Sequence, residues 1–64
     1  MNMLQTLRHQ RQKSLEDVAS ELGISWGALY RYEHRKALPR LDNAFKLCDY
    51  YGLTMDDLRK FFAC

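Results

Sequence analysis

The chain has 64 residues, of which 47% are hydrophobic and 28% are charged, and its formal net charge is +2. This length holds one small domain and excludes a large catalytic cleft between domains. The composition excludes a disordered tail, so we expect a single folded domain over residues 1–64.

The spacing of apolar residues predicts helices throughout the chain, the first of which ends near Gln12. A second helix begins after Ser14, whose hydroxyl is placed to cap it together with Asp17. Its apolar residues stand at i, i+3, i+4 and i+7, at Leu15, Val18, Ala19 and Leu22. Gly23 then ends this helix, because glycine readily adopts the left-handed conformation of a helix C-terminus.

Ser25 is placed to cap a third helix, which runs from Trp26 to about His34. In this helix Leu29 and Tyr32 are expected to face inward, which leaves the other side chains of its first two turns to face outward.

Pro39 separates the third helix from a fourth one, which ends at Gly52. The expected apolar face of the fourth helix consists of Leu41, Ala44, Phe45 and Cys48, widened by Leu47 and Tyr51. Thr54 caps a fifth helix together with Asp57. Its expected apolar side consists of Met55, Leu58 and Phe62. Because no alternating strand pattern of useful length is present, we predict a compact all-α fold of five short helices.

Residues 15–34 combine two helices joined by a short connection, Gly23-Ile24-Ser25. Ala19 stands where the two helices cross, and its small side chain permits a close approach. Apolar side chains form a wedge between the helices, at Val18, Ile24, Leu29 and Tyr32. This combination indicates a helix-turn-helix, although a plain pair of antiparallel helices has the same spacing.

The charged residues are unevenly distributed. Residues 1–13 and residues 31–40 each carry a net charge of +3, whereas residues 14–30 carry −3. Two basic blocks suit a surface that binds an anion such as nucleic acid, although solvated helix faces produce the same count.

One set of spaced positions extends over nearly the whole chain and carries a resemblance to a known family. They are Leu7-Arg8, Leu15-Glu16-Asp17-Val18-Ala19, Leu22-Gly23-Ile24-Ser25, Leu29, Tyr32-Glu33, Pro39, Leu41, Tyr51-Gly52-Leu53 and Met55-Asp56-Asp57-Leu58. At these positions the chain resembles the lambda-repressor and Cro-like (XRE-type) helix-turn-helix family. The resemblance implies a five-helix DNA-binding domain that inserts its third helix into the major groove of a double-stranded DNA operator, as a transcriptional regulator and predicted repressor.

Within that resemblance, the exposed N-terminal half of the third helix supplies the candidates for base reading, namely Trp26, Gly27, Ala28, Tyr30 and Arg31. Arg31 is the strongest of them, because a guanidinium can bridge both major-groove acceptors of guanine. Candidates for contacts with phosphates or the minor groove are Lys13, Ser25, His34, Arg35, Lys36 and Arg40. Two alternatives stay open, since Arg31 can instead contact a phosphate and Trp26 can pack against the body or a partner.

Two positions depart from the family's pattern. Leu15 stands where many relatives carry a glutamine that clamps a phosphate, and Arg35 replaces the usual glycine after the third helix. The positions matching Arg8 and Glu33 form an ion pair in relatives. The resemblance therefore assigns this pair to orienting the third helix rather than to contacting DNA.

The rival hypothesis is a protein-interaction module, such as an antitoxin or a co-regulator, that uses the same fold with Trp26 and Tyr30 exposed. We also expect a homodimer, because a single module reads too few base pairs to find a genomic site. Phe61 and Phe62 are adjacent and do not both fit one core comfortably, so together with Tyr50 they are the candidates for an exposed dimer patch.

An enzyme is not expected, nor is a metal or a cofactor. The two histidines stand apart, the cysteines lack metal-ligand spacing, and the chain has no glycine-rich phosphate loop. Cys48 and Cys64 are too few for a small disulfide scaffold, which favours a reducing compartment. With no apolar run of membrane-spanning length and no signal peptide, we expect a cytoplasmic protein that does not bind membranes.

Overall fold

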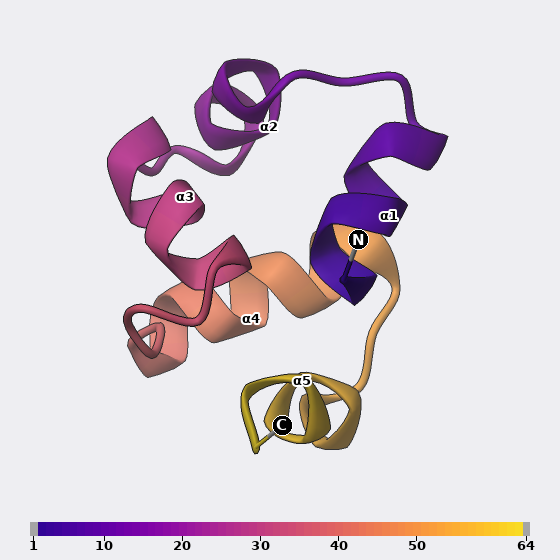
Figure 1. Ribbon diagram of the computed structural model, residues 1–64. Coiled ribbons are helices and arrows are strands. Elements are labelled where there is room, and N and C mark those ends of the chain that lie inside the picture. Colours follow the sequence, from indigo (N-terminus) through magenta and orange to yellow (C-terminus); the bar gives the residue numbers. More distant parts are fainter. Residues whose placement is uncertain (1, 64) are drawn as a thin grey trace.

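The computed structural model describes residues 2–63, and over that range it contains five helices and no strand. The helices are α1 (Met3–Gln10), α2 (Leu15–Leu22), α3 (Trp26–Glu33), α4 (Leu41–Tyr51) and α5 (Met55–Ala63). The predicted all-α, five-helix fold is confirmed. Figure 1 shows α2 and α3 next to each other, α4 across the centre, and α5 on the side of α4 away from α2.

Reciprocal side-chain caps begin α2 and α5, as predicted. The Ser14 hydroxyl accepts a hydrogen bond from the Asp17 amide at 3.1 Å, and the Asp17 carboxylate accepts one from the Ser14 amide at 3.2 Å. Thr54 and Asp57 exchange the same pair of hydrogen bonds, both at 3.0 Å. These bonds lower the pKa of both aspartates, because they stabilise the ionised carboxylate.

A further cap, which the sequence analysis missed, begins α1. The Asn2 side chain accepts a hydrogen bond from the Gln5 amide at 3.0 Å, and the Gln5 side chain accepts one from the Asn2 amide at 3.3 Å. Asparagine followed three residues later by glutamine carries this signal in the sequence. The helix ends at Gln10, earlier than predicted, and Gln12 takes a left-handed conformation with φ 55°.

Left-handed glycines end α2 and α4, as predicted. Gly23 has φ 72° and Gly52 has φ 70°. A Cβ atom added at either position would meet no other atom within 4 Å. The backbone conformation, and not a lack of space, therefore favours glycine at both positions.

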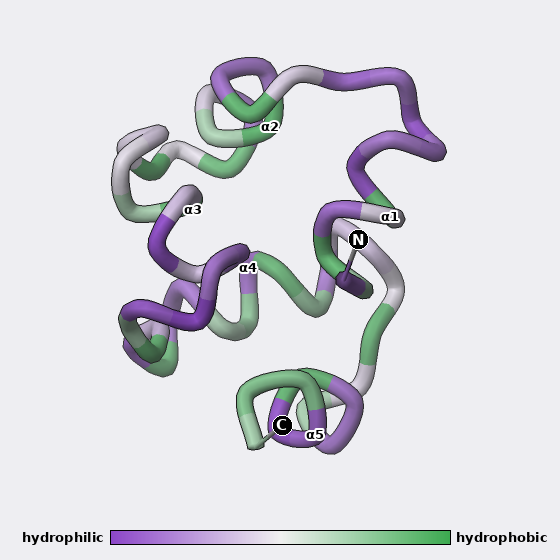
Figure 2. Tube along the Cα trace, in the orientation of Figure 1, coloured by the Kyte–Doolittle hydropathy of each residue, from purple (hydrophilic) through white to green (hydrophobic). Residues whose placement is uncertain are grey.

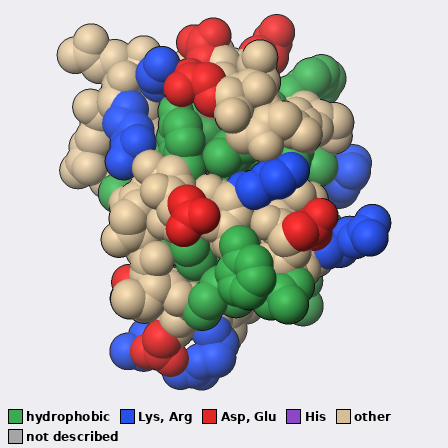
Figure 3. All heavy atoms as spheres, turned by 180° about the vertical axis from the view of Figure 1, so that it is seen from behind, with side chains coloured by type: hydrophobic (Ala, Val, Ile, Leu, Met, Phe, Trp, Pro, Cys, Tyr) green, Lys and Arg blue, Asp and Glu red, His purple; other side chains and the backbone are tan. Residues whose placement is uncertain are grey.

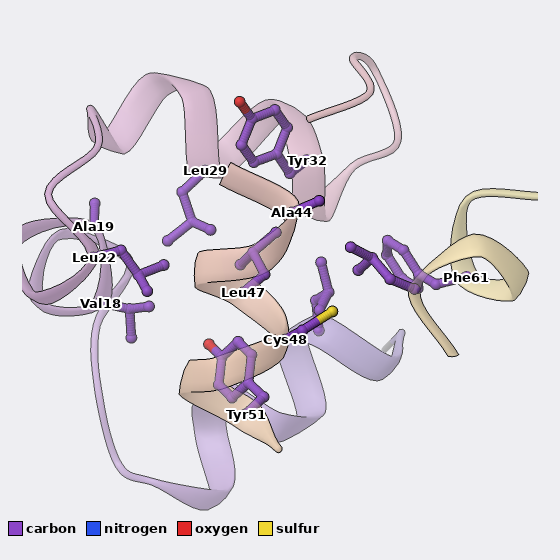
Figure 4. Packing of buried hydrophobic residues seen from close by; sticks show 12 residues of the cluster. Val18, Ala19, Leu22, Leu29, Tyr32, Ala44, Leu47, Cys48, Tyr51 and Phe61 are labelled. Carbon is purple, nitrogen blue, oxygen red and sulfur yellow. The ribbon is translucent and has the colours of Figure 1, made fainter. Parts of the chain in front are cut away.

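All five helices contribute to one core (Figure 4), and α4 runs through its middle. The buried apolar residues are Leu4, Val18, Ala19, Leu22, Leu29, Tyr32, Ala44, Leu47, Cys48, Tyr51, Leu58 and Phe61. Burial raises the pKa of the Cys48 thiol, which packs here as a small hydrophobic group. Cys64 lies outside the described residues.

The predicted core face of α4 is wrong at two positions. Leu41 is 63% exposed and Phe45 is 49% exposed. The four buried residues of α4, Ala44, Leu47, Cys48 and Tyr51, all belong to the predicted face. Leu41 and Phe45 fit the same helical spacing, so the periodicity of α4 alone does not exclude them. Packing against the other helices selects the side of the face that contains Leu47.

The prediction for α5 is wrong in a similar way. Phe61 is 4% exposed and belongs to the core, whereas Phe62 is only half-buried and Met55 is 41% exposed. The rings of Phe61 and Phe62 meet edge to face, with their centroids 4.9 Å apart. Leu58 is buried as predicted. Phe61 is consequently not available as an exposed dimer contact, whereas the half-buried Phe62 still is.

The position of α4 leads to a prediction about two matched truncations. Leu47→Ala removes a fully buried side chain and is expected to lower the free energy of unfolding by about 2–5 kcal/mol. Phe45→Ala removes a larger side chain that is half exposed, and is expected to cost less than about 1 kcal/mol. Urea denaturation measures both. Equal losses in the two variants would show that α4 is rotated from the position described.

Candidate nucleic-acid interface

The helix-turn-helix begins with a close contact between α2 and α3, joined by residues 23–25. Ala19 is 2% exposed at this contact, and its carbonyl accepts a hydrogen bond from the Ile24 amide at 3.0 Å. Val18 and Leu29 are fully buried, and Ile24 packs against the core. The apolar wedge predicted from the sequence is therefore present, and it fixes how α3 leaves α2.

The inner face of α3 consists of its three buried residues, Leu29, Tyr32 and Glu33. Tyr32 also bonds to α4, because its hydroxyl accepts a hydrogen bond from the Asn43 side-chain amide at 3.0 Å. With this face held inside, the opposite side of α3 is directed outward.

Glu33 is the one buried charged residue among those described, with 1% of its surface exposed. Its two carboxylate oxygens accept hydrogen bonds from Arg8, at 2.8 Å from Nε and 3.1 Å from Nη2. The structure thus forms the ion pair expected between α1 and α3, and the hydrogen bond to Glu33 raises the pKa of Arg8. Breaking such a buried pair typically costs about 3–5 kcal/mol, because the remaining charge is left without a partner.

Two other groups of α1 and α4 surround this pair. The Asn2 side chain donates to the carbonyl oxygen of Glu33 at 2.6 Å, so α1 holds both the backbone and the side chain of the last residue of α3. Tyr51 is buried nearby, and desolvation together with the negative charge of Glu33 raises its pKa to about 12. The Tyr51 hydroxyl has no hydrogen-bond partner among the described residues.

Aromatic side chains form a row at four-residue spacing on the outer face of α3. Trp26, in the first turn, is 60% exposed, and Tyr30, one turn later, is 41% exposed. The Tyr30 and His34 rings lie against each other with centroids 4.2 Å apart, and the Lys36 ammonium is 5.8 Å from the Tyr30 ring centroid. Trp26 is thus exposed rather than packed into the body of the domain.

A second outward row consists of Gly27 and Arg31. A Cβ atom added at Gly27 would lie 3.8 Å from Nη1 of Arg31, so the guanidinium extends back toward the start of α3. The two other candidates in this turn, Ser25 and Ala28, already have contacts within the domain. Ala28 packs against the core, and its amide donates to the capping hydroxyl of Ser25 at 3.1 Å.

The first basic block is largely used within the molecule. Lys13 forms a surface ion pair with Glu21 at 2.8 Å, which raises the pKa of Lys13 and lowers that of Glu21. The Arg11 guanidinium lies over the rings of Tyr50 and Tyr51, at 4.9 and 5.1 Å from their centroids. Lys13 therefore reaches a phosphate only by leaving a partner, although an exposed pair of this kind is weak.

Arg35, in the second basic block, is held against α5. Its Nε atom donates to the Phe61 carbonyl oxygen at 2.7 Å, and its guanidinium lies 4.1 Å from the centroid of the Phe61 ring. Its backbone keeps the left-handed conformation of a glycine turn, with φ 56°. A cation near the carbonyl end of α5 is favourable, and so is its contact with the ring. The structure therefore gives Arg35 a partner within the molecule.

The other cations of this block remain on the surface. They are Arg31, Lys36 and Arg40, all of them exposed. Within residues 2–63 these three form no ion pair with an acidic side chain. Figure 2 shows the hydrophilic stretch at the end of α3 and the segment that follows it. The exposed cations of the second basic block therefore lie on α3 and the connection to α4.

The expected dimer patch of Tyr50, Phe61 and Phe62 does not form. Phe61 is buried, and the Tyr50 hydroxyl donates to Glu21 at 3.1 Å on the side of α2. Phe62 instead lines an open, mostly apolar groove of about 370 Å³ between α5 and the connection before α4. The groove is lined by Leu38, Pro39, Met55, Leu58, Arg59, Phe62 and Ala63. Figure 3 shows apolar side chains gathered on the lower part of the face seen from behind.

A family model described as a helix-turn-helix domain matches residues 3–61, which span α1 to α4 and most of α5. This match is consistent with the lambda-repressor and Cro-like resemblance. No curated protein and no solved structure matches the chain.

Within residues 2–63, no group of three or more histidine, cysteine, aspartate or glutamate residues is arranged to hold a metal ion. None of the five helices has the length and apolar character needed to cross a membrane.

The raised pKa of Tyr51 predicts a loss of stability at alkaline pH. The unfolded chain ionises Tyr51 near its ordinary pKa of about 10, whereas the folded chain keeps the proton up to about pH 12. Its contribution to stability is therefore complete below about pH 10 and is lost as the pH rises toward 12. Denaturant unfolding at about pH 9 and about pH 11 measures this loss.

Tyr51→Phe is the matched control for that titration. It is expected to unfold with nearly wild-type free energy at neutral pH, because the hydroxyl that it removes has no protein partner. Its stability should fall less than that of the wild type between about pH 9 and about pH 11. An equal fall in both proteins would contradict a perturbed Tyr51.

Proposed function

The chain belongs to the helix-turn-helix domain family, and we propose that it is a sequence-specific regulator of transcription that binds double-stranded DNA. The observation that carries this proposal is the outward face of α3. Trp26 and Tyr30 are exposed there beside the free guanidinium of Arg31, while Glu33 is anchored in the interior. A rigid helix with an open N-terminal half suits insertion into the major groove.

Base reading is assigned to the first two turns of α3. Arg31 is the proposed reader of guanine, since a bidentate contact to O6 and N7 discriminates by about 1–3 kcal/mol. Gly27 lets the DNA approach the helix closely, and Trp26 and Tyr30 supply apolar surface. Ala28 contributes less, because its side chain is partly covered by the core.

Phosphate contacts are assigned mainly to the end of α3 and the connection that follows. Lys36 and Arg40 are exposed cations there, and His34 and the start of α3 at Ser25 are further candidates. The other side of the unit is less suitable, because the first turn of α2 carries Glu16 and Asp17. We therefore propose a backbone contact that is strongest beyond the C-terminus of α3.

Repression is the proposed outcome in the cell, because occupation of an operator is enough to block other proteins. We also propose a cytoplasmic location, because two cysteines without a disulfide scaffold favour a reducing compartment.

The second candidate is a protein-interaction module, such as an antitoxin or a co-regulator. It is favoured by one observation, the 60% exposure of Trp26 beside exposed Tyr30. A test of whether the protein prefers any DNA sequence distinguishes these two functions.

Selection of binding sites from random duplex DNA tests the proposal. We expect an enriched motif whose affinity falls steeply with salt, by about 0.9 in log–log slope for each phosphate contacted. The measurement is a binding isotherm on the selected duplex at several salt concentrations. No enrichment, with equal binding to all sequences, would instead favour the protein-interaction module.

Two variants serve as controls for the salt titration. Lys36→Ala is expected to weaken binding to all sequences alike and to reduce the slope by about 0.9. Arg35→Gly preserves the left-handed turn and removes a guanidinium that is bonded to Phe61, so the slope should stay at the wild-type value. A matching reduction in Arg35→Gly would place Arg35 on a phosphate instead.

We propose that the protein binds DNA as a homodimer. The two copies contact each other through the groove between α5 and the connection before α4. The groove is mostly apolar, and Leu38 at its edge is 74% exposed. Two-fold pairing doubles the number of base pairs read. Phe62 keeps its expected place in this interface, whereas Phe61 and Tyr50 do not.

Sedimentation of two matched variants tests the dimer. Leu38→Asp puts a charge into the groove and is expected to yield monomers, because a buried unpaired carboxylate opposes association. Leu41→Asp changes a residue that is 63% exposed but does not line the groove, and should sediment like the wild type. A wild-type monomer at high concentration, both free and on DNA, would rule the dimer out.

A further inference from the structure

The outer face of α3 has a limited set of groups with which to read DNA. Residues 25–34 contain no asparagine and no glutamine. The single acidic residue of this segment, Glu33, is buried and bonded to Arg8. The face therefore lacks the amide that pairs with adenine and the carboxylate that accepts from cytosine.

Beside single hydrogen bonds from the hydroxyls of Ser25 and Tyr30, two kinds of base contact discriminate most strongly on such a face. A guanidinium pairs with the O6 and N7 acceptors of guanine, and an apolar surface contacts the 5-methyl group of thymine. Arg31 supplies the first and Trp26 supplies the second, with the largest exposed apolar surface on α3. The Tyr30 ring lies against His34 and is less free to adapt.

The geometry of the first turn relates these two contacts. Trp26 and Gly27 are consecutive, and Nη1 of Arg31 lies 3.8 Å from the place where a Cβ of Gly27 would stand. Arg31 leaves the helix one turn later than Trp26, but its guanidinium therefore reaches back beside the first turn, from which the indole projects. With a rise of about 3.4 Å per base pair, groups so placed meet bases one or two steps apart.

We propose that Trp26 reads the methyl group of a thymine that lies within two base pairs of a guanine read by Arg31. The half-site of the operator is then defined by this thymine and guanine rather than by an adenine. The inference rests on the proposed function and names what the same face recognises.

The experiment changes single atoms of the selected operator. Each thymine is replaced in turn by deoxyuridine, which removes only the methyl group, and each guanine by 7-deazaguanine, which removes the N7 acceptor. Binding isotherms are measured for the wild type, Trp26→Ala, Arg31→Ala and Phe45→Ala. Phe45 is an exposed aromatic residue of α4 and serves as the matched control for Trp26.

The wild-type protein is expected to bind the operator about fourfold more weakly when one particular thymine lacks its methyl group. This is the effect of a buried methyl group worth about 0.8 kcal/mol. A guanine within two base pairs should lose about tenfold without N7. Trp26→Ala should abolish the first effect and Arg31→Ala the second. Phe45→Ala should retain both.

The outcomes separate this inference from the proposed function. A selected motif whose affinity is unchanged by every deoxyuridine, or whose methyl effect persists in Trp26→Ala, overturns the inference and leaves the proposed function intact. A methyl effect more than two base pairs from the guanine overturns it as well. If no motif is selected at all, the proposed function itself fails. The deoxyuridine and 7-deazaguanine series is measured with the wild-type protein, so the size and spacing of the two effects test the inference even if a variant does not fold.

Discussion

The buried ion pair between Arg8 and Glu33 is the constraint on which the exposed surface depends. A carboxylate that is 1% exposed has to be paired, because an isolated charge in the interior is strongly destabilising. Since Glu33 is the last residue of α3, its pairing with α1 fixes the rotation of that helix about its axis. Trp26 and Arg31 are then held on the outside. Together with the buried Leu29 and Tyr32, this pair determines which residues α3 can present to a partner.

The cations of the two basic blocks fall into two groups. Those of residues 1–13 contact acidic or aromatic groups of the domain itself, and Arg35 joins them from the other block. Arg31, Lys36 and Arg40 remain exposed and form no ion pair with an acidic side chain of the described residues. The small net charge of +2 therefore conceals a one-sided distribution of available charge, which is what a phosphate backbone would meet.

Local features of the sequence predicted the elements well, because caps and left-handed glycines act over a few residues. Ser14 with Asp17, Thr54 with Asp57, and Gly23 all lie where short-range chemistry places them. The failures concern choices that depend on distant packing. Leu41 and Leu47 fit the same periodicity, and only the neighbouring helices decide between them. The partner of Arg35 is 26 residues away in the chain, so its role could not be read from its surroundings in sequence.

Arg35 also links the two surfaces to which a function has been assigned. Arg35 follows His34, the residue that caps the C-terminus of α3, and it bonds to Phe61 of α5. Three residues later, Leu38 stands at the edge of the groove. In a domain this small, few residues separate the helix proposed to face DNA from the groove proposed to bind a second copy. A partner seated in the groove would therefore contact the segment that fixes the end of α3. The distance between two such helices in a dimer would be set through this short connection, which Arg35 bonds to α5.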